Sequence, residues 1–189
     1  NSNCRDMFYH FEGVTEFVFR NFNTSQVQDM YRMFRRCDAL ETLNVSCFNT
    51  ENVTNMGQMF GGNSKLKDIN GLNVFDTSKV TDMRRLFAET LITTLDLTNF
   101  DTSKVTDMSE MFYSCKELTE VNVSNFNTAN VKNMGKMFYE CSSLTKLDVS
   151  SFNTANVQDM QYMFHYCSKL TELDLSGFNT ANVQDMQNM

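Results

Sequence analysis

The 189-residue chain has no proline, no tryptophan and only 7 Gly, and it has few positive charges for its length. Its 16 Lys and Arg are outnumbered by 23 Asp and Glu, for a net charge of −7, which argues against nucleic-acid binding because that function usually relies on a basic surplus. No apolar run approaches the roughly 20 residues of a membrane-spanning helix, so we expect no direct membrane insertion in this segment. The length predicts one domain, or one segment of an extended architecture.

Phenylalanine and methionine are abundant instead, with 17 and 14 residues, and both follow an internal repeat. The tripeptide Phe-Asn/Asp-Thr recurs every 25 to 27 residues, at Phe22, Phe48, Phe75, Phe100, Phe126, Phe152 and Phe178. All Met residues fall in two columns of this repeat, and a second Phe column follows the second Met column. We therefore interpret residues 1–189 as a single repeat segment that starts and ends within a repeat, with about six full coils between Phe22 and Phe178.

Two hydrophobic periods alternate within each repeat. Leu147 and Val149 alternate as in a strand with one buried face, whereas Val157, Met160, Met163 and Phe164 follow the spacing of one helix face. Neither element can bury its apolar face alone, but stacked repeats can bury both. The sequence therefore predicts an α/β repeat solenoid with one short strand, in a concave parallel sheet, and one short helix per repeat. The length changes near residues 70–72 and 90–91 predict local bulges.

The complete repeat resembles that of the BspA-like leucine-rich-repeat surface proteins. The resemblance rests on the strings L-T-x-L-D-L-S and F-N/D-T-x-x-V-x-D/N-M-x-x-M-F-x-x-C, and it covers the whole chain. Phe126 and its equivalents depart from ordinary leucine-rich repeats, which usually place a buried Asn or Cys there. The resemblance implies a right-handed solenoid, display at a bacterial or protist cell surface or secretion, and adhesion or protein binding. It carries over no binding residue, because the binding positions of that family are not fixed.

Recurring cysteines and threonines have both structural and functional interpretations. The cysteines of one column are expected to be buried free thiols, since stacked side chains point in parallel and a disulfide needs them to converge; these are Cys37, Cys115, Cys141 and Cys167. No C-x-x-C motif occurs and the two histidines are far apart in the repeat, so no metal site and no cofactor are expected. The Thr column is expected to cap a turn or helix in each coil rather than to form a surface ladder that binds ice or glycans.

The candidate binding surface is a strip of outward strand residues. Its members are Asn44, Asp96, Glu120, Asn122, Lys146, Asp148, Glu172 and Asp174. Carboxylates about 5 Å apart in neighbouring coils repel modestly in water, which could serve a calcium ion or a basic partner, although calcium needs six to eight oxygen ligands. A basic or polar partner surface and a merely solvated face therefore remain the main alternatives.

No pattern in the sequence favours catalysis, because a repeat supplies the same residues to every coil whereas an active site needs an asymmetric set. We therefore expect a non-enzymatic module that binds an extracellular protein or glycan through the concave strand face and adjoining loops. A structural spacer, or a scaffold for another domain of a longer surface protein, is the alternative. Outward residues vary more irregularly from coil to coil in the first half of the chain, which weakly favours binding and places it in that half.

The two ends of the segment predict self-association. The last coil leaves the apolar sides of Val183, Met186 and Met189 without a following coil. Because uncovered apolar surface usually finds a partner, we expect the segment to associate end to end or to fray at the C-terminal coil.

Overall fold

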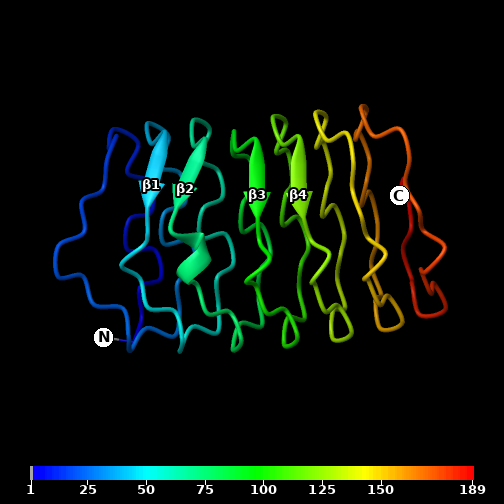
Figure 1. Ribbon diagram of the computed structural model, residues 1–189, viewed down its shortest axis with the longest axis horizontal. Coiled ribbons are helices and arrows are strands. Elements are labelled where there is room, and N and C mark those ends of the chain that lie inside the picture. Colours follow the sequence, from blue (N-terminus) through cyan, green and yellow to red (C-terminus); the bar gives the residue numbers. More distant parts are fainter. Residues whose placement is uncertain (1) are drawn as a thin grey trace.

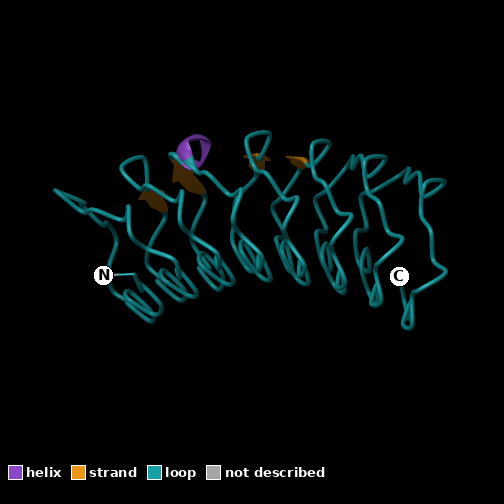
Figure 2. Cartoon of the chain, turned by 90° about the horizontal axis from the view of Figure 1, so that it is seen from below, coloured by secondary structure: helices purple, strands orange, loops and turns teal. Residues whose placement is uncertain are grey.

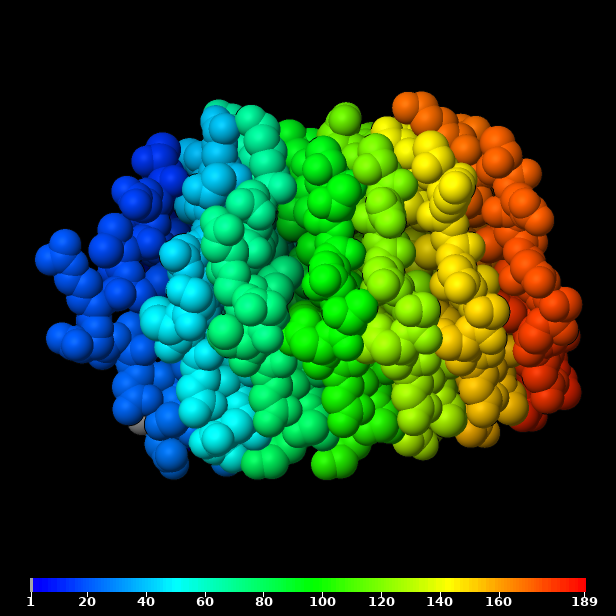
Figure 3. All heavy atoms as spheres, in the orientation of Figure 1, coloured from blue at the N-terminus to red at the C-terminus, as the bar shows by residue number. Residues whose placement is uncertain are grey.

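The computed structural model describes residues 2–189 as a stack of coils that follow one another along the long axis of the molecule, from the N-terminus to the C-terminus (Figure 1). Four strands of three residues each are present, β1 (Thr42–Asn44), β2 (Asp68–Asn70), β3 (Thr94–Asp96) and β4 (Glu120–Asn122). β1 pairs in parallel with β2, and β3 with β4. Figure 3 shows the coils as neighbouring bands of atoms.

The predicted helix is wrong, and with it the α/β solenoid. Within residues 2–189 the only helix is η1 (Leu72–Val74), a single 3-10 turn. The second Met column and the Phe that follows it lie instead in six-residue segments built of turns, which we call the turn segments: residues 5–10, 31–36, 57–62, 84–89, 109–114, 135–140 and 161–166. The second and sixth residues of every turn segment have positive φ, for example Lys136 (φ 56°) and Glu140 (φ 56°). A right-handed helix cannot pass through such residues.

Backbone hydrogen bonds along a turn segment alternate between two directions. Lys136 N–H donates to Gln161 O at 2.8 Å and Phe138 N–H to Met163 O at 2.9 Å, so these donors bind the next coil. The intervening donors close turns within the coil, as from Tyr139 N–H to Lys136 O at 3.1 Å. The first N–H, that of Gly135, donates to the side chain of Asn133 at 2.8 Å. Every N–H of this segment is thereby satisfied without the helical i to i−4 pattern.

Spacing between coils explains why turns replace helices. Packed helices need about 8–10 Å between their axes, whereas hydrogen-bonded chains lie about 4.8 Å apart. The rings of Phe112 and Phe138, in equivalent positions of neighbouring coils, have centroids 5.2 Å apart and an interplanar angle of 13°. Coils this close leave no room for a helix in each one.

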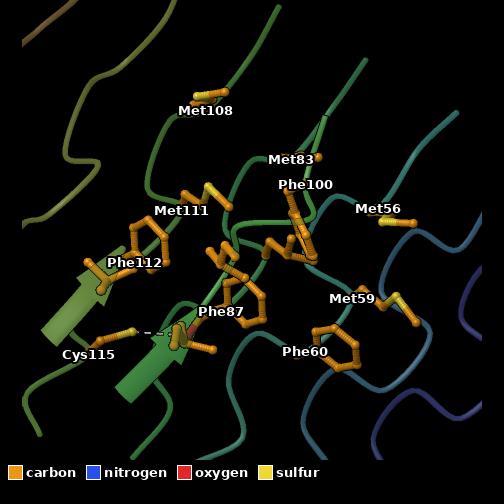
Figure 4. Close-up of a cluster of buried hydrophobic side chains, with 14 of the residues drawn as sticks. Met56, Met59, Phe60, Met83, Phe87, Phe100, Met108, Met111, Phe112 and Cys115 are labelled. Carbon is orange, nitrogen blue, oxygen red and sulfur yellow. Dashed lines mark hydrogen bonds between the residues drawn. The ribbon is translucent and has the colours of Figure 1, made fainter. Parts of the chain in front are cut away.

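The predicted core is confirmed. The Met, Val and Phe columns are buried throughout the central coils, and both Met134 and Phe138 are fully inaccessible. Figure 4 shows Met and Phe side chains of successive coils lying beside one another in the interior. The stacked second Phe column continues from Phe34 to Phe164 with ring centroids between 5.2 and 6.2 Å apart.

The extra residue near position 71 is absorbed by η1. Gly71 has φ 97°, and a Cβ atom there would lie 2.4 Å from the backbone nitrogen of Ser46 in the preceding coil. Only glycine fits both the backbone conformation and this close approach.

The stack bends into a shallow arch, with the strands on its outer side and the turn segments on its inner side (Figure 2). The concave sheet expected from the sequence is therefore wrong: the strand side is convex. Isolated parallel bridges join neighbouring coils on the turn side in an unbroken series from Asn3 to Asp185. On the strand side, β2 and β3 are not paired with each other, and residues 146–148 and 172–174 form no strands. The side with the fewer backbone bonds lies on the outside of the arch.

Replacing Lys136 tests the turn geometry directly. Both Lys136→Gly and Lys136→Ala remove the same side-chain contact, the approach of the ammonium group to the ring of Tyr162. Because a Cβ atom disfavours positive φ, we expect the glycine variant to be more stable than the alanine variant by about 1 kcal/mol. In a helix the order would be reversed by about the same amount.

Chemical denaturation of both variants measures this difference. Gln161, which does not have positive φ, provides the matched control, where alanine should be the more stable of the two substitutions. An alanine advantage at Lys136 would contradict the turn assignment.

Candidate functional site

All eight residues of the predicted strip are exposed on the strand side of the stack. Four of them, Lys146, Asp148, Glu172 and Asp174, line one shallow hollow of about 320 Å³ between two coils that are not paired there. Asp96, Glu120 and Asn122 line a second hollow over β3 and β4. The structure thus brings the strip residues together in pairs of neighbouring coils, and not into one enclosed pocket.

The Asn and Asp residues of the strip have a structural task. Asp148 Oδ1 accepts a hydrogen bond from Ser150 N–H at 2.9 Å, and Asp174 Oδ1 accepts one from Ser176 N–H at 2.8 Å. Asn44, Asp96 and Asn122 close the same turn. Hydrogen bonds from the serines, through the side chain and the backbone, lower the pKa of Asp148 and Asp174. These residues recur because each coil needs this turn.

Glu120, Lys146 and Glu172 are the strip residues without such a role in the described structure. They occupy one column of the repeat in three successive coils, and their charge changes sign from coil to coil. Only this column of the strip carries the irregularity expected of a binding surface.

A more irregular surface lies on the turn segments, and the sequence analysis did not identify it. The third and fourth residues of each turn segment belong to the Met and Phe columns, while the other four residues form what we call the turn face. Its fifth position, read along the stack, contains Tyr9, Arg35, Gly61, Ala88, Tyr113, Tyr139 and His165. The small residues Gly61 and Ala88 are buried, and the other five are partly exposed. The signal was present in the sequence as variable columns between invariant ones.

Arginine and tyrosine dominate the N-terminal part of the turn face. The guanidinium groups of Arg5, Arg32 and Arg84 lie over the ring of Tyr31, at 4.6, 5.0 and 5.4 Å from its centroid. Arg32 also forms an ion pair with Asp6 at 2.7 Å, and the hydrogen bond from this pair raises the pKa of Arg32. In this part of the chain these arginine side chains therefore already contact a tyrosine ring or a carboxylate of the chain itself.

The Thr column forms an internal ladder rather than a cap or a surface. Each of its buried hydroxyl groups donates to a backbone carbonyl of the next coil, as from Thr128 to Asn153 O at 3.0 Å. Most of them also accept from the N–H of the same residue, as Thr128 does from Asn153 N–H at 2.7 Å. The turn itself is closed by the preceding side chain, with Asn127 accepting from Ala129 N–H. Thr128 is fully buried, so it cannot take part in a surface ladder.

Burial of the cysteine column is confirmed for Cys37, Cys115 and Cys141, while Cys167 is partly exposed. Each thiol points to the carbonyl oxygen of the Phe column in the preceding coil, as from Cys141 Sγ to Phe112 O at 3.1 Å. Burial raises the pKa of Cys115 to about 11 and that of Cys141 well above its usual value. These thiols are protonated near neutral pH.

Residues 2–189 lack two further features. Nowhere in that range are three or more His, Cys, Asp or Glu side chains grouped so that they could hold a metal ion. The same residues include no helix that is both long enough and apolar enough to cross a membrane.

These observations define the class of the protein as a repeat solenoid of leucine-rich-repeat type, built from turns. A crystal structure of a leucine-rich repeat protein from Bacteroides ovatus superimposes with a TM-score of 0.56 over 88% of this chain, at 21% sequence identity. The likeness supports the fold alone, and the chain matches 38% of the length of that protein.

The sequence itself identifies the family. Residues 2–92 and 89–189 each match the family described as Mycoplasma protein of unknown function, DUF285, and the chain belongs to that family. No curated protein matches the sequence.

The thiol environment predicts a wide range of alkylation rates. Cys47 is exposed, whereas Cys115 and Cys141 are buried and have raised pKa values. Because the thiolate is the nucleophile, we expect iodoacetamide at pH 8 to label Cys47 readily, and to label Cys115 and Cys141 only after denaturant is added. Mass spectrometry of peptides from a labelling time course measures the rates. Equal labelling of all three cysteines in the folded protein would contradict this assignment.

Proposed function

We propose that this chain is a non-enzymatic binding module of a cell-surface or secreted protein, and that it engages extracellular macromolecules mainly through the turn face. The resemblance of its repeat to the BspA-like proteins supports the proposed location and the role in adhesion. The variable columns of the turn face carry the proposal, because recognition requires side chains that differ from coil to coil while the framework repeats.

The inner position of the turn face also supports this choice. The turn segments line the inner side of the arch (Figure 2), and concave surfaces of solenoids are suited to extended contacts with macromolecules. On the outer side, the repeated Asn and Asp residues of the strip serve the turns. Because these residues repeat from coil to coil, the strand side by itself fits the alternative function better, in which the segment is a spacer that presents another domain.

Binding of the immobilised segment to extracellular-matrix proteins and glycans tests the proposal. We expect the double variant Arg36→Ser/Tyr166→Ser, at two exposed positions of the turn face, to weaken binding at least about tenfold, as the loss of two moderate contacts would. The matched strand-side variant Lys146→Ser/Glu172→Ser should bind as the parent does.

If the strand-side variant lost affinity and the turn-face variant bound as the parent does, binding would be assigned to the strip. Absence of binding to every protein and glycan tested would contradict the proposal and favour the spacer.

End-to-end self-association remains a separate proposal for this segment. Met186 is 47% exposed at one end of the stack and Phe11 is 44% exposed at the other. Light scattering over a concentration series should show reversible growth of the mean mass, because a head-to-tail contact does not close on itself. The variant Met186→Lys should reduce that growth, whereas Gln184→Lys, with the same added charge on a neighbouring exposed residue, should not. A constant monomer mass at every concentration would contradict it.

A further inference from the structure

Five aromatic side chains gather on the C-terminal part of the turn face, in three successive coils. This tyrosine patch consists of Tyr113, Tyr139, Tyr162, His165 and Tyr166, and it holds four of the six tyrosines of the chain. Tyr139 lies at its centre, stacked on Tyr113 with centroids 5.0 Å apart and an interplanar angle of 6°. Tyr162 and Tyr166 meet Tyr139 edge to face, at 6.2 and 5.7 Å.

The rings are accessible from solvent. Tyr166 is 59% exposed, and the other four members of the patch are partly exposed. A cation is attracted to the face of an aromatic ring, and an aromatic cage surrounds it with the faces of rings that are steeply inclined to one another. Tyr162 and Tyr166 are inclined to Tyr139 in this way, at 71° and 78°.

The rest of the turn face shows how this protein covers its tyrosines. Tyr9 and Tyr31 lie under arginine guanidinium groups, and Arg85 lies over Tyr113 at 5.2 Å from the ring centroid. Over residues 2–189, no lysine or arginine lies over the ring of Tyr139 or Tyr166. Within the patch, Lys136 approaches the ring of Tyr162, at 5.8 Å from its centroid.

Charged residues are also distributed unevenly between the N-terminal and C-terminal parts of the chain. All seven arginines lie in residues 1–85, whose net charge is zero, whereas residues 86–189 contain six lysines, thirteen acidic residues and a net charge of −7. Packing against the other rings, together with the charge of Glu140, raises the pKa of Tyr139. The uncovered rings therefore lie in the acidic part of the molecule.

We propose that the tyrosine patch binds an arginine- or lysine-rich segment of a partner protein, whose cations take the positions over Tyr139 and Tyr166 that arginines of the chain itself take over Tyr9 and Tyr31. Cation–π contact with the rings supplies the local recognition. The negative charge of residues 86–189 attracts the segment over longer distances. This inference rests on the proposed function, since it names one partner class for the turn face.

A nine-residue oligo-arginine peptide is the probe, with oligo-glutamate and a neutral oligosaccharide as the alternatives. The chain lacks tryptophan and four of its six tyrosines are in the patch, so tyrosine fluorescence reports mainly on the patch, and isothermal titration calorimetry gives the affinity. We expect oligo-arginine alone to bind and to quench the emission. Tyr139→Leu and Tyr166→Leu each keep the net charge and should weaken binding about two- to fivefold, as the loss of one exposed cation–π contact would.

Two control variants distinguish the contribution of the patch rings from that of net charge and from that of any tyrosine on the turn face. Tyr9→Leu alters the same position of the turn face at the other end of the stack and should leave the affinity unchanged. Asp148→Asn/Asp174→Asn removes two charges from the strand side and should have a smaller effect than either patch variant. Tyr166→Leu keeps the test valid if Tyr139→Leu fails to fold, because Tyr166 is mostly exposed.

Several results would overturn the inference. These are an unchanged affinity of Tyr166→Leu for oligo-arginine, an equal loss in the Tyr9 or strand-side control, and binding of the oligosaccharide but not the peptide. If the protein self-associates, and both Tyr139→Leu and Arg36→Ser abolish that self-association, the segment bound at the patch belongs to a second copy of this chain. Matrix or glycan binding that Arg36→Ser abolishes and Tyr139→Leu leaves intact would reject this inference while preserving the proposed function.

Discussion

The alternation of backbone hydrogen bonds along each turn segment is the constraint on which the rest of this structure depends. Donors such as that of Lys136 must reach the next coil, and donors such as that of Tyr139 must close a turn within the coil. The second and sixth residues of each turn segment adopt positive φ, and this backbone conformation meets both demands. The same alternation holds neighbouring coils close enough for the Phe rings to stack, so backbone geometry and core packing fix each other.

Much of the core could be predicted from recurrence alone, because a column such as the one containing Phe138 has to face the interior in every coil. Its secondary structure could not be predicted in that way. Inward residues at i, i+3 and i+4 occur in a helix, and they also occur when Met134, Met137 and Phe138 flank a tight turn. The spacing between coils separates the two, since stacked helices require nearly twice the distance that hydrogen-bonded chains do.

The candidate surface shows the same division between recurrence and geometry. Exposure of strip residues such as Asp148 followed directly from strand alternation. Their role in closing turns through Ser150 N–H did not, because a repeated Asn or Asp is equally compatible with a repeated ligand contact. The turn face was missed for a related reason: the sheet was expected to form the concave side, so that Arg35, Tyr139 and their neighbours were expected on the outer side, whereas the turn segments line the inner side of the arch (Figure 2).

A framework held by backbone bonds explains how that surface can vary. Coil-to-coil contacts use main-chain groups, buried Thr hydroxyls and an apolar core, and most coils accept a large side chain at the fifth position of the turn segment. Gly61 is an exception, because a Cβ atom there would lie 2.8 Å from the backbone oxygen of Arg85. Arg35, Tyr139 and His165 therefore occupy equivalent sites without disturbing the stack. Selection on this surface can act almost independently of selection on the fold. The uneven placement of arginine, tyrosine and acidic residues along the turn face is therefore not imposed by the backbone framework, and it is the observation on which the proposed partner contact depends.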